Sequence, residues 1–91
     1  MNENYKLNML DMTIKFYQLD RKNYVKMVNK LKKMGYGVNV IKDEIQAYMS
    51  TSTKKELVEK FDLDYDTALP MVKMFRKVLS QYNTYKKKSW R

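Results

Sequence analysis

Residues 53–71 read TKKELVEKFDLDYDTALPM, and this stretch decides how the chain folds. Thr53 and Glu56 have the spacing of a capping box, in which each side chain bonds the other residue's backbone N–H at a helix start. Leu57, Val58 and Phe61 give the short helix that follows its apolar side. Aspartates at 62, 64 and 66 favour a turn and a new helix cap. The stretch therefore predicts a helix, a tight turn and a second helix beginning near residue 65 or 67.

This second helix is predicted to be long. Pro70 falls in or close to its first turn, where a missing N–H costs little. An apolar stripe then recurs every three or four residues, which is the helical period, at Ala68, Met71, Phe75, Val78, Tyr82 and Tyr85. Leu69, Val72 and Leu79 broaden it. A face this wide predicts either packing along the first helix or a helix-to-helix dimer.

Three helices are predicted upstream, because glycine and proline are scarce there. The first covers residues 4–19, with one apolar face at Tyr5, Met9, Met12, Phe16 and Leu19. Four further apolar residues widen that face, so the helix is predicted to be mostly buried or packed on two sides: Leu7, Leu10, Ile14 and Tyr17. Alternation of apolar residues over 12–16 leaves a strand as the rival interpretation.

The second predicted helix runs from an Asp20 cap to about Met34 and stops at Gly35. Its core stripe is Tyr24, Met27, Val28, Leu31 and Met34. Its opposite stripe is basic, with Lys22, Lys26, Asn29 and Lys33 supported by Lys30, and is either a solvated surface or a phosphate-contacting face. A third helix is predicted from an Asn39 cap through Met49, with residues 50–53 as a turn. Its inward residues are Ile41, Ile45, Tyr48 and Met49.

The predicted fold is all-α: a small bundle of four to five helices with a helix-turn-helix-like unit and a long C-terminal helix. Residues 1–85 form one helical domain, and residues 86–91 form a basic tail. With 91 residues, the chain is long enough for one compact domain but too short for two.

The segment at 53–71 resembles a helix-turn-helix DNA-binding unit and covers about a fifth of the chain. Leu57, Val58 and Phe61 match core positions of the first helix of such a unit. Leu63 takes the apolar position after the turn, and Ala68 and Met71 take inward positions of the reading helix. This resemblance implies DNA binding. The segment departs from the family pattern at Asp62, where glycine is usual, at Asp64 and Asp66, where DNA would be met, and at Pro70, which offers no hydrogen bond to a base.

Charge favours the same partner. The net charge is +9, and the last nineteen residues hold five lysines, two arginines and no acidic residue. Basic side chains neutralise phosphates, and aromatic side chains stack on bases. The predicted nucleic-acid contacts are Lys54, Lys55, Tyr65, Thr67, Lys73, Arg76, Lys77, Lys86, Lys87, Lys88 and Arg91. The competing interpretation is a solvated basic tail.

Catalysis is not expected. The chain has no cysteine and no histidine, so thiol nucleophiles, histidine bases and the usual zinc sites are excluded. The aspartates at 62, 64 and 66 match the start of a calcium loop, but Thr67 and Lys73 stand where glycine and glutamate are needed. We expect no metal and no cofactor. No signal peptide or membrane span is evident, which predicts a cytoplasmic protein.

The sequence therefore predicts a small basic DNA-binding protein, of the phage or plasmid transcriptional-regulator type, that contacts mainly phosphates. The alternative is a phage-type adaptor or inhibitor that docks on a DNA-processing or transcription complex. Its predicted protein interface is Met71, Phe75, Val78, Tyr82 and Tyr85, a face that could also form a homodimer. Amphipathic membrane association is the least favoured interpretation.

Overall fold

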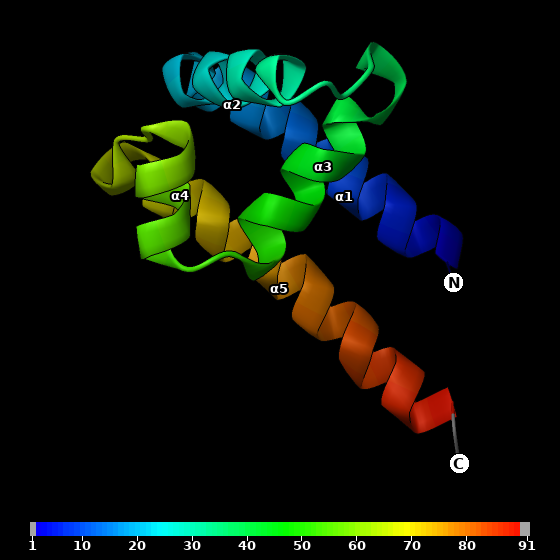
Figure 1. The fold of residues 1–91 in the computed structure, drawn as a ribbon. Helices are drawn as coiled ribbons and strands as arrows, with labels where there is room; N and C mark the ends of the chain where they lie inside the picture. Colours follow the sequence, from blue (N-terminus) through cyan, green and yellow to red (C-terminus); the bar gives the residue numbers. More distant parts are fainter. Residues whose placement is uncertain (1, 90–91) are drawn as a thin grey trace.

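The computed structural model describes the backbone of residues 2–89 and the side chains of residues 4–83, and all regular structure in that part of the chain is helical (Figure 1). The five helices are α1 (Asn2–Leu19), α2 (Arg21–Lys33), α3 (Val38–Thr51), α4 (Lys54–Phe61) and α5 (Tyr65–Ser89). The all-α prediction is confirmed. The strand interpretation of residues 12–16 was wrong, because α1 runs through them without interruption.

The first and last helices run antiparallel and frame the core (Figure 1). The rings of Tyr5 and Tyr82 lie 4.3 Å apart, and those of Phe16 and Phe75 lie 6.2 Å apart with their planes nearly perpendicular. Residues early in α1 therefore meet residues late in α5, as an antiparallel pair requires. Helix α3 packs against both α1 and α5, and it brings Ile45 and Met49 into the same fully buried cluster.

Helix ends follow local chemistry. Asp20 precedes α2 with non-helical backbone angles, and its carboxylate accepts from the Asn23 amide at 2.7 Å rather than capping a backbone N–H. Gly35 ends that helix at φ +96°, a conformation that favours glycine. The capping box at Thr53 and Glu56 is present with both reciprocal bonds. The positions of these three boundaries match the sequence predictions, although the Asp20 side chain does not form the expected cap.

Two boundary predictions were wrong. Gly37, not Asn39, is the N-cap of α3, and that helix continues through Ser50 and Thr51 instead of turning there. Pro70 is the sixth residue of α5, just after its first turn, so the carbonyl of Asp66 lacks its usual helical donor. The prediction of a basic tail at 86–91 stays a prediction: the backbone of α5 runs to Ser89, and residues 90–91 lie outside the described chain.

Two predicted faces also differ from the structure. Leu7, Leu10, Ile14 and Tyr17 do not extend the buried face of α1 but remain exposed, as do Leu19, Met34 and Val58. Conversely, the predicted protein interface on α5 lies inside the molecule: Met71, Phe75 and Val78 are core residues. The wide stripe of α5 therefore packs along α1 and α3 of the same chain. Tyr85 lies among residues whose side chains are not described.

Candidate nucleic-acid interface

The turn between α4 and α5 forms one edge of the molecule, on the left of Figure 1. Asp62 closes α4 in the left-handed conformation (φ 58°, ψ 37°), and its N–H donates to the Val58 carbonyl at 2.9 Å. Aspartate tolerates this conformation better than most residues. Leu63 is buried beneath the turn, and the carbonyl of Asp64 accepts from the Ala68 N–H at 3.0 Å as α5 begins. The core positions that carried the resemblance are thus buried, with the exception of Val58.

Helix α2 holds this turn in place through Asn23, whose side chain is only 1% exposed. Its amide nitrogen donates to the Asp64 carbonyl at 3.1 Å and to the Thr67 hydroxyl at 2.8 Å. Its amide oxygen accepts from the Asp64 N–H at 3.0 Å. Lys26, one turn further along, donates to the Asp62 carbonyl at 2.7 Å and lies 3.7 Å from the Asp62 carboxylate. The turn is therefore clamped from outside the α4–α5 unit.

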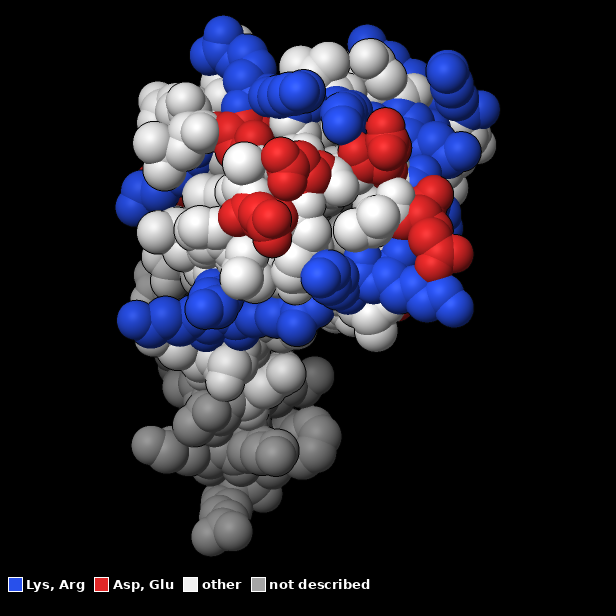
Figure 2. Space-filling view, turned by 90° about the vertical axis from the view of Figure 1, so that its left-hand side faces the viewer, with Lys and Arg blue, Asp and Glu red and all other residues white. Residues whose placement is uncertain are grey.

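Charge on this side of the molecule is divided (Figure 2). Acidic side chains gather in the middle of the face, with rows of basic side chains along its upper and lower borders. The exposed carboxylates of the turn and the first turn of α5 are Asp62, Asp64 and Asp66, and together they form the acidic strip. The upper border lies at the height of α2.

Four of the predicted contact lysines lie at the start of α4 and in the middle of α5. Lys54 lies with its Nζ 5.3 Å from the centre of the Tyr65 ring, so two predicted contact residues are brought together. Lys55 is 3.9 Å from the carboxylate of Glu59 and highly exposed. Lys73 and Lys77 are one turn apart on the exposed side of α5, opposite the buried Phe75, and neither is within ion-pair distance of any carboxylate in the described chain.

Two predicted contact residues have internal roles instead. Arg76 donates through its guanidinium to the Ser52 carbonyl and so ties α5 to the C-terminal end of α3. The Thr67 hydroxyl accepts from Asn23 and donates to the Asp64 carbonyl at 3.1 Å. Both residues stabilise the fold in this arrangement. The side chains of Lys86, Lys87, Lys88 and Arg91 lie outside the described residues.

The ionisable groups around α4 are tuned by hydrogen bonding. The backbone and side chain of Thr53 lower the pKa of Glu56, so this carboxylate is charged at neutral pH. Lys60 donates to the Tyr48 hydroxyl at 3.0 Å, and this bond raises the pKa of its ammonium group. The nearby carboxylate of Glu44 raises the pKa of Tyr36. Each shift strengthens the ordinary charge state at pH 7, which suits a binding surface rather than proton transfer.

Helix α2 contributes basic residues whose stripe the sequence left open as either a solvated surface or a phosphate-contacting face. Lys26 contacts the turn directly, and Lys22 and Lys30 lie one turn before and after it on the same side of α2. The spacing of four was visible in the sequence. What could not be seen was that this side of α2 borders the α4–α5 turn, because residues 23 and 64 are 41 positions apart.

Comparison with known proteins gives no assignment: no family model, curated protein or solved structure matches this chain. In the described residues there is also no group of three or more acidic, histidine or cysteine side chains able to hold a metal ion. Nor is any helix among them long and apolar enough to cross a membrane.

Proposed function

We propose that this chain is a small DNA-binding protein that grips duplex DNA mainly by its phosphates. The observation that carries the proposal is the set of exposed lysines on α4 and α5 that have no carboxylate partner among the described residues, above all Lys73 and Lys77. Unpaired cations lose few existing contacts when they bind phosphate, and each one releases a condensed counterion from DNA.

The arrangement of charges on this face supports a particular orientation of the protein on DNA. Phosphates of the two strands border a groove on both sides, and the basic rows border the acidic strip in the same way (Figure 2). The strip would then face the groove, where a carboxylate can accept from the amino group of cytosine. Phosphate neighbours would repel the same carboxylates. Because this repulsion offsets any hydrogen bond from the carboxylates to a base, we expect the affinity for DNA to depend little on base sequence.

The biological role that fits such binding is transcriptional regulation of the phage or plasmid type, in the cytoplasm. This role rests on the positive charge and the helix-turn-helix resemblance of residues 53–71. The adaptor alternative is weakened, because Met71, Phe75 and Val78 are buried within the chain and unavailable to a partner.

The test is a gel-shift titration of a labelled duplex at two salt concentrations, using the full chain and a variant that ends at residue 85. We expect binding at low salt that weakens steeply at high salt, with the shorter variant binding less tightly but still binding. Absence of binding by the full chain to any duplex at low ionic strength would refute the proposal.

A further inference from the structure

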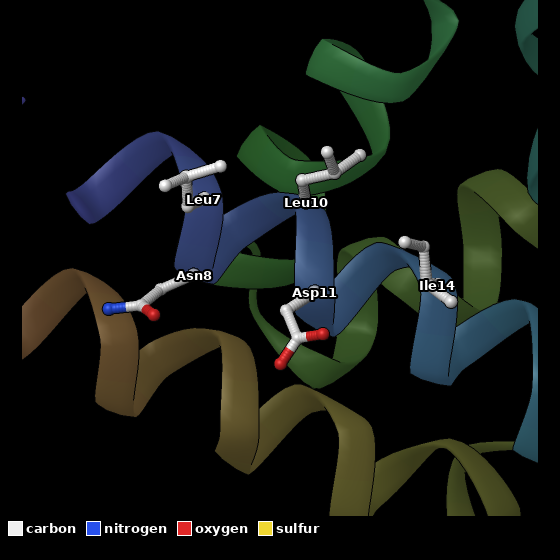
Figure 3. A pocket seen from close by; sticks show the side chains of 5 residues that line it. All are labelled: Leu7, Asn8, Leu10, Asp11 and Ile14. Carbon is white, nitrogen blue, oxygen red and sulfur yellow. The ribbon is translucent and has the colours of Figure 1, made fainter. Parts of the chain in front are cut away.

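Helix α1 carries an apolar stripe with no partner in the described chain (Figure 3). Leu7, Leu10 and Ile14 follow one another along the helix with their side chains on its surface, beside Asn8 and Asp11. Tyr17 continues the series, but its ring is partly covered, because the Tyr24 ring lies 5.3 Å away and the Arg21 guanidinium lies 4.0 Å from its centre. The exposed fractions are 62% for Leu7, 37% for Leu10, and 45% for both Ile14 and Tyr17. Three large apolar residues of α1, Leu7, Leu10 and Ile14, are thus partly in solvent on one side of the helix.

Their spacing is that of a helix-pairing seam. Positions 7, 10, 14 and 17 are separated by three, four and three residues, the alternation of a and d positions in a coiled coil. The residues that α1 buries in its own domain, Met9, Thr13 and Phe16, belong to a different face. Helix α1 therefore has two apolar faces: one is buried in the core of the domain, and the other is exposed to solvent.

We propose that this stripe pairs with the same stripe of a second copy of the chain, with the two α1 helices parallel. Charge complementarity selects both the partner and the direction. With Leu7 and Leu10 at a and d, Lys6 takes the preceding g position and Asp11 the following e position. In a parallel pair these two positions of opposite helices face each other, and they carry opposite charges. Two symmetric Lys6–Asp11 pairs form.

The antiparallel arrangement is disfavoured by the same residues. It would match Leu10 with Ile14 across the two-fold axis and bring the two Asp11 carboxylates next to each other. The only described ion pair of Asp11, with Lys15 at 3.9 Å, is exposed and weak. It leaves the carboxylate free to turn toward the lysine of another copy.

The strength of this association is limited by its length. From residue 7 to residue 17 the helix rises about 15 Å, well short of a long coiled coil. The dimer is therefore weak and concentration-dependent. It uses a different helix from the proposed DNA face, so either proposal can fail without the other.

Sedimentation equilibrium of the full chain tests the pairing. We expect the mean mass to rise toward twice the monomer as concentration increases, Ile14→Asp to stay monomeric, and Leu19→Asp to behave like the natural chain. Leu19 is 71% exposed on the same helix but off the stripe, which makes it the matched control. Monomer mass at every soluble concentration, or an Ile14→Asp variant that dimerises unchanged, would overturn the proposal. Circular dichroism shows whether each variant is folded.

Direction is tested by cross-linking, since the chain has no cysteine of its own. In a parallel pair the two residues at position 14 face each other within disulfide reach, so Ile14→Cys should form a covalent dimer on oxidation and Leu19→Cys should not. Likewise, Lys6→Glu should weaken the dimer, and adding Asp11→Lys should restore it. An Ile14→Cys chain that resists cross-linking, or a double charge swap that fails to restore pairing, would contradict the parallel arrangement.

Discussion

The side chain of Asn23 forms two hydrogen bonds with the backbone of Asp64, accepting from its N–H at 3.0 Å and donating to its carbonyl at 3.1 Å. This buried side-chain amide thus bonds both the N–H and the carbonyl of one residue in the α4–α5 turn, as a paired backbone would. It sets where α5 begins, and so where the acidic strip and the lysines of α5 lie relative to α2.

Replacing Asn23 by alanine should destabilise the protein by about 1–3 kcal/mol, because it removes a buried side chain that is the acceptor for the Asp64 N–H, while the Asp64 carbonyl keeps its bonds from Thr67 and Ala68. Urea unfolding followed by circular dichroism measures this. Asn29→Ala, an exposed position on the same helix, should change stability by less than about 0.5 kcal/mol. Equal losses in both variants would show that Asn23 does not clamp the turn.

The left-handed conformation of Asp62 predicts how the stability of the protein changes with the residue at this position. A β-branched residue suffers most there, so Asp62→Val should cost about 1–2 kcal/mol. Asp62→Gly should be close to neutral, because glycine adopts positive φ without strain and Lys26 can still donate to the carbonyl of residue 62. Thermal unfolding of both variants decides the matter. A valine variant as stable as the glycine variant would contradict the assigned conformation.

The capping box predicts a pH dependence. Because its hydrogen bonds with Thr53 lower the pKa of Glu56 in the folded state, the stabilisation is full above the unfolded pKa and is lost as the pH falls through the folded one. The natural chain should therefore lose more stability between neutral pH and acid than Glu56→Gln, with thermal unfolding as the measurement. Glu59→Gln, which lies outside the cap, should follow the natural chain. Parallel curves for the natural chain and Glu56→Gln would argue against the cap.

The buried stripe of α5 predicts that Phe75 supports folding rather than partner binding. Its side chain is fully buried against Phe16, so Phe75→Ala should destabilise the domain by about 3–5 kcal/mol. Chemical denaturation measures the loss. A variant with natural stability would mean that this face is open in solution and would restore the adaptor interpretation.

Local signals in the sequence were sufficient to predict where the helices lie along the chain. The Thr53–Glu56 box, Gly35 and the period of the apolar residues each act within a few positions, and each gave the right element. Pairing between distant helices was not visible locally. Nothing near Met71 or Phe75 says whether their stripe meets α1 or another molecule, and nothing near Leu10 says that its side of α1 stays uncovered.

In the candidate site, too, some features follow from the local sequence and others depend on distant residues. The exposure of Lys73 and Lys77 follows from the position of Phe75 on the opposite side of the helix, so the sequence could predict it. The internal bonds of Thr67 and Arg76 depend on Asn23 and Ser52, which lie 44 and 24 residues away. Sequence reasoning assigned both to DNA because their residue types suit phosphate. Only the fold shows that other groups already hold them.

The acidic strip should oppose DNA binding. Asp66 is exposed at the start of α5, and one negative charge near a phosphate costs about 1 kcal/mol in water. We therefore expect Asp66→Asn to bind duplex about fivefold more tightly at low salt, by fluorescence anisotropy. The gain should shrink as salt is added. Weaker binding by this variant would indicate that the carboxylate accepts a hydrogen bond from a base.

The most direct test of the central claim is the salt dependence of duplex affinity in two double variants of equal charge. Lys73→Gln with Lys77→Gln removes the unpaired lysines of the proposed face. Lys32→Gln with Lys42→Gln removes two exposed lysines that flank the α2–α3 connection, and this connection lies away from the α4–α5 turn (Figure 1). We predict that the first pair makes the slope of log affinity against log salt shallower by about two units, while the second leaves it nearly unchanged. Equal slopes for the two double variants would contradict a DNA interface at α5.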